Sequence, residues 1–169
     1  MHPKRLRAAA ALWIVAGLCY LTAEAVAAAG FPHYSYCTHY VSDLGRPLQS
    51  PSAALMNAAF IAQGLAFALA AALVVTAMRR GPGAIAFLVL AVAYGAGSAV
   101  VGVFHSGGGD TSALVHVGGA VTAIVAGNLA VLTAGGVLLR RSRFRAFGLS
   151  TCALGTAGLL CGAPQNVST

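Results

Sequence analysis

Five long apolar runs, separated by short polar segments, dominate the pattern of the chain. They cover residues 8–29, 52–78, 83–104, 112–138 and 146–163. A helix needs about 20 apolar residues to cross a hydrocarbon core of about 30 Å, a length that the first four runs reach and the fifth narrowly misses. The pattern therefore predicts an all-α polytopic transmembrane helical bundle with five spans, forming a single transmembrane domain over residues 1–169.

The basic residues mark the same boundaries. Nine of the ten lie in three clusters at the ends of the apolar runs: Lys4, Arg5 and Arg7; Arg79 and Arg80; Arg140, Arg141, Arg143 and Arg145. Only Arg46 lies on the other side of the predicted membrane. Short loops rich in Lys and Arg stay cytoplasmic, so this partition predicts a cytoplasmic N-terminus in a bacterial plasma membrane. The basic residues form no continuous face, and we therefore expect no nucleic-acid partner.

Composition supports a membrane protein. Hydrophobic residues make up 59% of the chain and charged residues 8%, and the mean hydropathy is +0.83, whereas soluble domains carry about 25% charged residues. The first run contains Glu24 and lacks a small-x-small cleavage site, so we interpret it as a span and not as a signal peptide. Glycines within the runs predict close helix packing inside the chain: Gly64, Gly95, Gly97, Gly118, Gly119, Gly127, Gly135 and Gly136.

The reactive side chains gather on the predicted outer side, in the loops at residues 30–51 and 105–111 and in the neighbouring helix ends. Four of the five histidines map to this layer: His33, His39, His105 and His116. All three acidic residues, Glu24, Asp43 and Asp110, also lie on the outer side of the membrane midplane. The sequence therefore predicts one polar face and one basic face.

Several segments resemble a known family. They are residues 40–47, 54–65, 102–104 and 114–120. They resemble the bacterial and archaeal six-span membrane family catalogued as domain of unknown function nine-nine-eight. Members carry Ser-Asp/Glu-Leu-Gly before span two, an Asn at the start of that span and a His opening span four. Here the matching positions are Ser42, Asp43, Leu44, Gly45, Asn57 and His116.

The resemblance implies a fold and a candidate site without implying a reaction. Members tend to have Pro after the Phe that ends span three, where this chain has His105 after Phe104. A sixth span is also missing, and we expect the chain to be a C-terminally truncated member. A remote relation of the family to eukaryotic lipid-handling membrane proteins favours a lipid ligand, by fold-level analogy only.

The segment from Ser42 to Arg46 has two interpretations. In the structural one, Ser42 or Asp43 acts as a helix cap, and Asp43 pairs with Arg46 to hold the loop. In the functional one, the segment belongs to a binding pocket. An acidic residue inside a span costs about 2.5–3.5 kcal/mol, so Glu24 must face the bundle and find a partner, for which we predict His116. The predicted pocket comprises Glu24, His39, Asp43, Asn57, His105 and His116.

Two kinds of chemistry can be written for these residues. Histidine and carboxylate side chains suit zinc, and the candidate ligands are His33, His39, His105 and His116. A hydrolase could use Ser42 and His116 with Asp43 or Asp110. However, the chain has neither a zinc-protease spacing such as HExxH nor a G-x-S-x-G nucleophile elbow.

Two cysteines, Cys37 and Cys161, fall on the predicted oxidising side and are candidates for a disulfide.

The absence of catalytic spacing leads to the main functional prediction. We expect a small integral membrane protein that binds a membrane lipid or another membrane protein through its outer polar pocket. The alternative is a metal-dependent membrane-surface hydrolase of a lipid ester or amide.

Overall fold

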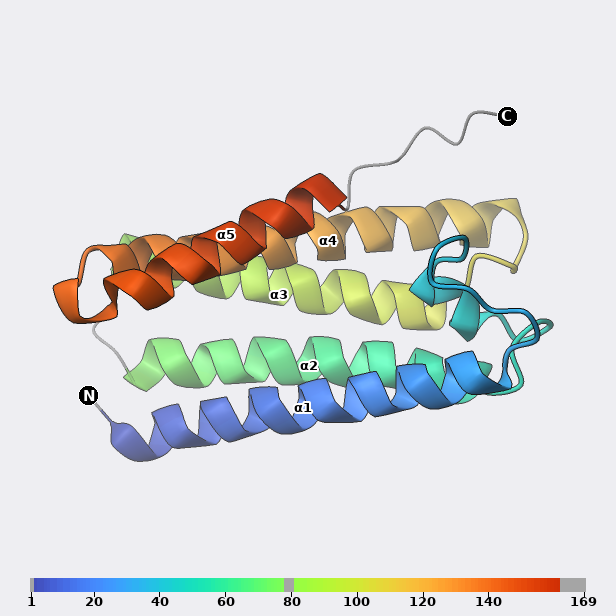
Figure 1. Cartoon of the computed structure of the whole chain (residues 1–169), viewed down its shortest axis with the longest axis horizontal. Helices are drawn as coiled ribbons and strands as arrows, with labels where there is room; N and C mark the ends of the chain where they lie inside the picture. The colour runs from blue at the N-terminus through green and yellow to red at the C-terminus, as the bar shows by residue number, and fades with distance from the viewer. Residues whose placement is uncertain (1, 78–80, 162–169) are drawn as a thin grey trace.

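The structure is a computed structural model that describes residues 2–77 and 81–161. Its long elements are five α-helices, and all five are long and apolar enough to cross a membrane. They are α1 (Pro3–Gly30), α2 (Ala53–Ala77), α3 (Pro82–Val103), α4 (Asp110–Leu139) and α5 (Arg145–Cys161) (Figure 1). Two short 3₁₀-helices, η1 (Val41–Gly45) and η2 (Ser142–Phe144), lie in the loops. The prediction of an all-α transmembrane bundle is confirmed, and the chain is a multi-pass membrane protein.

The helix boundaries follow the predicted runs closely. Proline occupies the first turn of α1 and of α3, where its missing N–H costs no hydrogen bond. α1 begins at Pro3, earlier than the predicted residue 8, because the basic residues of the first cluster continue the helix beyond the apolar run. The predicted end of the fifth span at residue 163 lies outside the described residues.

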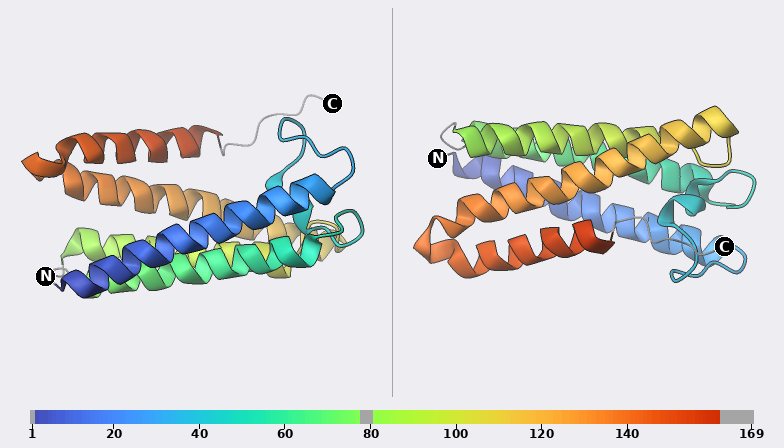
Figure 2. Two further views of the ribbon diagram at one scale, coloured as in Figure 1. Left: turned by 60° about the horizontal axis from the view of Figure 1, so that its bottom comes forward. Right: turned by 90° about the horizontal axis from the view of Figure 1, so that it is seen from above.

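Each helix packs mainly on its neighbours in the chain. α1 contacts α2, α2 contacts α3, α3 contacts α4, and α4 contacts α5. α3 therefore lies between α2 and α4, and α1 and α5 lie at opposite edges in the view of Figure 1. Seen from above in Figure 2 (right), α4 runs between α3 and α5. This order decides which polar side chains can meet across the bundle.

Glycines bring the central helices into backbone contact. A Cβ placed on Gly64 of α2 would lie 2.7 Å from the carbonyl oxygen of Gly95 on α3. A Cβ on Gly97 would lie 2.6 Å from the carbonyl oxygen of Gly119 on α4. Small residues allow such approaches where lipid provides no hydrophobic drive for association. The prediction of close packing is confirmed at these positions, whereas Gly118 and Gly136 face open space.

Two apolar clusters stabilise the bundle. One joins α2, α3 and α4 around Phe87, with Trp13 of α1 packed against it. The other lies near the end of α1 and joins Ala27, Leu44 and Met56, all of which are fully buried. The second cluster attaches η1 to α1 and α2 and so positions the polar loops described next.

Candidate functional site at the loop end

The two ends of the bundle differ in charge. We call residues 31–52 and 104–109, with the adjoining helix ends, the loop end; it lies at the right of Figure 1. The first basic cluster and the α4–α5 turn lie at the opposite end, and the cluster at Arg79 and Arg80 falls outside the described residues. Within the described chain, Arg46 is the only Lys or Arg at the loop end, where Asp43 and Asp110 also lie. The predicted separation of a polar face from a basic face is present along the bundle axis.

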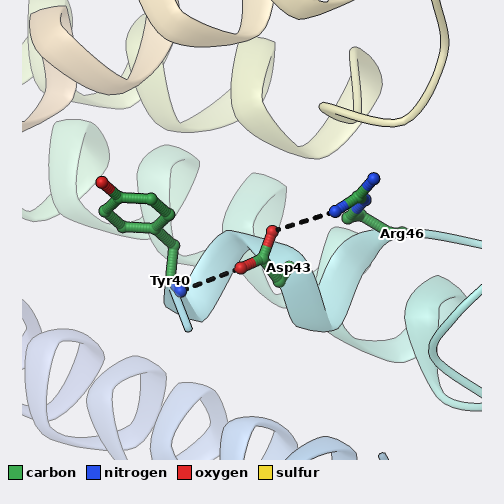
Figure 3. Close-up of polar contacts among 3 residues, drawn as sticks. All are labelled: Tyr40, Asp43 and Arg46. Atoms are coloured by element: carbon green, nitrogen blue, oxygen red, sulfur yellow. Dashed lines mark hydrogen bonds and ion pairs between the residues drawn. The ribbon is translucent and has the colours of Figure 1, made fainter. Parts of the chain in front are cut away.

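Asp43 organises the short helix η1. Its Oδ2 accepts a hydrogen bond from the backbone N–H of Tyr40 at 2.9 Å, which satisfies a donor at the start of the helix (Figure 3). Its Oδ1 lies 3.6 Å from a terminal nitrogen of Arg46, an ion pair longer than a hydrogen bond. The structural interpretation, in which Asp43 caps a turn and pairs with Arg46, is therefore confirmed as geometry.

Leu44 and Gly45 dock η1 onto the helices. The Leu44 side chain is fully buried between Ala27 of α1 and Met56 of α2. Gly45 is needed because any Cβ there would collide with the side chain of Asn57. The Asn57 amide donates a 2.9 Å hydrogen bond to the Gly45 carbonyl oxygen. The burial of Leu44 and the hydrogen bond between Asn57 and Gly45 thus attach η1 to α1 and α2.

His116 holds the second loop. It is only 4% exposed, and its Nδ1 lies 2.7 Å from the carbonyl oxygen of Phe104. A carbonyl only accepts, so Nδ1 carries the proton. One turn earlier on α4, the Ser112 hydroxyl donates to the carbonyl oxygen of His105 at 2.9 Å. Both bonds tie the α3–α4 loop down onto the start of α4.

A cavity of about 300 Å³ opens between the two loops. Its lining residues are Arg46, Pro47, Leu48, Gln49, His105 and Gly107. Beside it, three buried polar atoms have no hydrogen-bond partner among the described residues: Arg46 Nε, His105 Nδ1 and Ser106 Oγ. Ser50 Oγ, one residue beyond Gln49, is in the same condition. Buried polar groups normally find a partner, so this clustering marks the place where the protein can take a polar ligand.

Comparison with known families decides the relationship. A family model described as "Protein of unknown function (DUF998)" matches residues 14–167. The chain belongs to this family. The resemblance predicted from the motif residues is thereby confirmed. The comparisons find no match among curated proteins and none among solved structures.

In this DUF998 member, the predicted pairing of Glu24 with His116 is wrong. No ion pair joins them in the described structure, and His116 Nδ1 is bonded to Phe104. The reason is the packing order, because α1 packs on α2 and η1 whereas α4 packs on α3 and α5. Glu24 is half-buried on α1 and lies within electrostatic range of Tyr34 in the first loop.

His39 belongs to an aromatic cluster in the first loop. Its ring lies 5.8 Å from that of Phe31 and 5.5 Å from that of Tyr34. Its Nδ1 accepts the backbone N–H of Ser35 at 3.3 Å, a bond within the loop itself. Burial raises the pKa of Tyr34 above its ordinary value, and three nearby groups raise it further: Tyr36, Glu24 and Asp43. These contacts give His39 a role in shaping the loop.

The candidate zinc ligands do not gather. Within residues 2–77 and 81–161, no three His, Cys, Asp or Glu side chains lie close enough to hold one metal ion. His33 is exposed with a left-handed backbone (φ 59°), while His116 is buried against Phe104.

The hydrolase constellation is not assembled in the described chain either. His116 directs Nδ1 to a backbone carbonyl, the position that an aspartate occupies in a Ser-His-Asp triad. Ser42 lies on η1 and Asp110 is exposed in the first turn of α4, and no hydrogen bond joins either of them to His116. The arrangement is that of a scaffold for two loops.

The predicted disulfide is absent. All four cysteines lie in the described residues and are free. The described part of α5 ends at Cys161 after 17 residues, whereas α4 has 30. At 1.5 Å per residue this makes α5 shorter by about 20 Å, so Cys161 stops short of the loop that carries Cys37. α5 also lies at the opposite edge of the bundle from α1.

Sequence reasoning missed two features. Arg46 is absent from the predicted pocket, although it lines the cavity and its position as the sole basic residue on the outer side is visible in the sequence. A second set of polar side chains lies within the spans, where Gln63 and Ser98 lie beside the Tyr94 hydroxyl. A single Gln and a single Tyr inside otherwise apolar runs were the available signal. A groove of about 230 Å³ between α1 and α2 includes Tyr20 and Gln63 in its lining.

Proposed function

We propose that this DUF998 protein binds a membrane lipid non-catalytically, with the lipid's polar headgroup in the loop-end cavity. The observation that carries the proposal is the cavity itself. About 300 Å³ of space adjoins the unpartnered atoms of Arg46, His105 and Ser106 at one end of five apolar helices. Lipid headgroups lie at that depth in a bilayer, because the helices span the hydrocarbon core.

The rim of the cavity suits a lipid better than a soluble ligand. Leu48 lines the cavity and is 96% exposed, so it offers an apolar side chain next to the polar groups. Tyr36 and Tyr40 in the same region are also exposed, and tyrosines favour the membrane interface. An apolar rim next to polar donors matches a molecule with an acyl part and a polar head.

In this proposal, His116 and Asn57 are positioning residues. His116 sets the α3–α4 loop through Phe104, and Asn57 sets η1 through Gly45. The cavity lies between these two loops, so its width depends on both bonds. Replacing either residue with alanine would weaken lipid retention without any turnover to lose.

We place the protein in a bacterial plasma membrane with the loop end outside. The support is the position of the basic clusters at the other end. External thiol reagents would then label cysteines introduced at Ser35 and Gly108 and leave one at Gly81 unlabelled. The reverse pattern would contradict this orientation.

Lipid analysis of the protein extracted with its surrounding membrane tests the function. We expect at least one lipid class to be enriched over the bulk membrane in the wild-type sample. The enrichment should fall in His105→Ala and persist in His2→Ala, a control that removes a histidine at the opposite end. Lipids in bulk proportions would overturn the proposal.

A specific co-purifying membrane protein in place of a lipid would also overturn it, in favour of partner binding. Stoichiometric zinc, lost in His116→Ala but kept in His2→Ala, with cleavage of lipid esters or amides, would favour the hydrolase.

A further inference from the structure

Arg46 has a free hydrogen-bonding edge. Its ion pair with Asp43 uses one terminal nitrogen at 3.6 Å, while Nε is buried without a partner among the described residues. The position of a Cβ on Gly107 would be 3.3 Å from Nε and 3.8 Å from the second terminal nitrogen. The guanidinium therefore extends from η1 towards the α3–α4 loop, as Figure 3 shows. The Gly107 backbone lies against Nε, and the part of the guanidinium that stays open to the cavity is its terminal nitrogens, since the Arg46 side chain is 33% exposed.

The opposite wall adds two more groups. His105 Nδ1 and Ser106 Oγ are both buried and unpartnered in the described chain. A guanidinium can only donate, and a histidine nitrogen and a hydroxyl can each donate as well. The missing partner is therefore an oxygen-rich acceptor. Phosphate and carboxylate oxygens match the planar fork of arginine best.

The surrounding charges limit how negative that ligand can be. Asp43 stands next to the guanidinium, and no other Lys or Arg lies at this end of the described chain. Like charges repel in proportion to the product of their charges, so the Asp43 carboxylate opposes a dianion most. A singly charged group suffers half of this repulsion. A phosphodiester carries one negative charge and two unesterified oxygens.

We infer that the loop-end cavity recognises the phosphodiester of a phospholipid headgroup, with Arg46 and His105 as its direct ligands. This inference rests on the proposed function and names the chemistry of the same site. Asp43 is a positioning residue that holds Arg46, and the backbone of Gly107 lies on the other side of the guanidinium. Leu48, exposed at the rim, contacts the apolar part of the lipid.

Native mass spectrometry of the delipidated full chain, after addition of defined probes, tests the inference. Phosphatidylglycerol and phosphatidylcholine are the diester probes, phosphatidic acid the monoester, and diacylglycerol the phosphate-free lipid. We expect both diesters to be retained several-fold more than the other two. Excess inorganic phosphate should not displace them, which separates a lipid site from a site for the free ion.

Variants of Arg46 and Gly107 test whether these residues form the binding site for the phosphodiester. Arg46→Gln should lower diester retention roughly tenfold, as expected for loss of a charged hydrogen bond. Arg46→Lys should lower it less, because the charge remains without the fork. Arg143→Gln removes one positive charge at the opposite end and should change nothing. Gly107→Val places a side chain against the Arg46 guanidinium beside the cavity, and it should lower retention even if Arg46→Gln misfolds.

Three other results would contradict the inference, each in a different way. Retention of one lipid class regardless of its phosphate and of both Arg46 variants would overturn the inference and leave the proposed function standing. Competition by inorganic phosphate would show an ion site and overturn the lipid assignment. Retention of no lipid class above background would remove the inference and the proposed function together.

Discussion

The helix core and the loop end differ in how many of their buried polar side-chain atoms lack a hydrogen-bond partner. In the core, the buried Ser98 hydroxyl of α3 donates to the Phe60 carbonyl oxygen of α2 at 2.7 Å. Seven buried side-chain polar atoms of the described chain lack a partner, and five belong to the loop end: those of Tyr34, Arg46, Ser50, His105 and Ser106. The other two, Trp13 Nε1 and Gln63 Oε1, lie within the spans, so the unpartnered buried polar atoms of the described chain concentrate at the loop end.

Glycine serves both regions in different ways. Gly97 lets α3 and α4 touch through their backbones, because any side chain there would meet Gly119 and Ala123. Gly107 instead brings the backbone of the α3–α4 loop against the Arg46 guanidinium, beside the cavity. Substitutions in the core should therefore affect folding, and substitutions around the cavity should affect the ligand. The following variants test that division.

The largest effect is expected at Gly97. A Cβ there would lie 2.6 Å from the Gly119 carbonyl oxygen and 2.7 Å from the Ala123 nitrogen, and backbone atoms cannot move aside. Gly97→Leu should cost at least the roughly 1–3 kcal/mol of core overpacking, with loss of the monodisperse peak in size-exclusion chromatography. Gly118→Leu, at a site with nothing within 4 Å, is the control and should elute normally. Equal behaviour of the two would show that α3 and α4 do not touch here.

Leu44→Ala should follow in magnitude. Leu44 is fully buried where η1 meets α1 and α2, so truncation should lower the free energy of unfolding by about 2–5 kcal/mol. Leu48→Ala makes the same chemical change at a residue that is 96% exposed. It should leave the thermal midpoint unchanged and lower lipid retention. A destabilised Leu48→Ala would erase the distinction between docking and ligand contact in this loop.

His116→Phe should have a smaller effect. The ring volume is retained, but the Phe104 carbonyl oxygen loses its donor in a buried position. The free energy of unfolding should fall by about 1–3 kcal/mol in a denaturation series. His33→Asn is the control, because His33 is exposed and asparagine tolerates its positive φ. An unchanged His116→Phe would mean that this hydrogen bond does not hold the α3–α4 loop.

Tyr34→Phe should have the smallest effect. The hydroxyl is buried without a partner, so its removal should leave stability unchanged or slightly higher near neutral pH. Because the pKa of Tyr34 is raised in the folded chain, its contribution is present below the ordinary value of about 10 and is lost as pH rises through the raised value. The wild-type thermal midpoint should therefore drop more steeply than that of the variant above pH 10. Parallel curves would contradict the raised pKa.

The sequence predicted the spans and the cap and ion pair of Asp43 because both depend on local signals. Hydrophobic run length determines the helices, and Asp43, three residues before Arg46, can reach both a helix N-terminus and a guanidinium. The pairing of Glu24 with His116 failed for a different reason. The position of a residue along a span predicts its depth in the membrane but not which helices are neighbours. α1 packs on α2, whereas α4 packs on α3 and α5, so Glu24 and His116 lie on helices that are not neighbours. The disulfide of Cys37 with Cys161 failed because it required both the length and the edge position of α5.

The cavity could not be predicted for a related reason. Arg46 and Gly107 are 61 positions apart in the chain, and only the folded bundle brings the guanidinium against the α3–α4 loop. The residue types gave a partial signal, since a lone arginine among acidic residues is unusual. The space between the two loops depends on the hydrogen bonds of Asn57 and His116, which involve backbone carbonyls and leave no trace in residue pattern.

Photo-crosslinking tests the central contrast most directly. A phosphatidylcholine analogue with a photoactivatable group in its headgroup would be incorporated into membranes carrying the full chain, and the labelled peptides would be mapped. Labelling at residues 46–49 and 105–107, which falls in Arg46→Gln but not in Arg143→Gln, is the predicted result. Labelling confined to the basic α4–α5 turn at residues 140–145, or spread evenly over both ends, would contradict a headgroup site at the loop end.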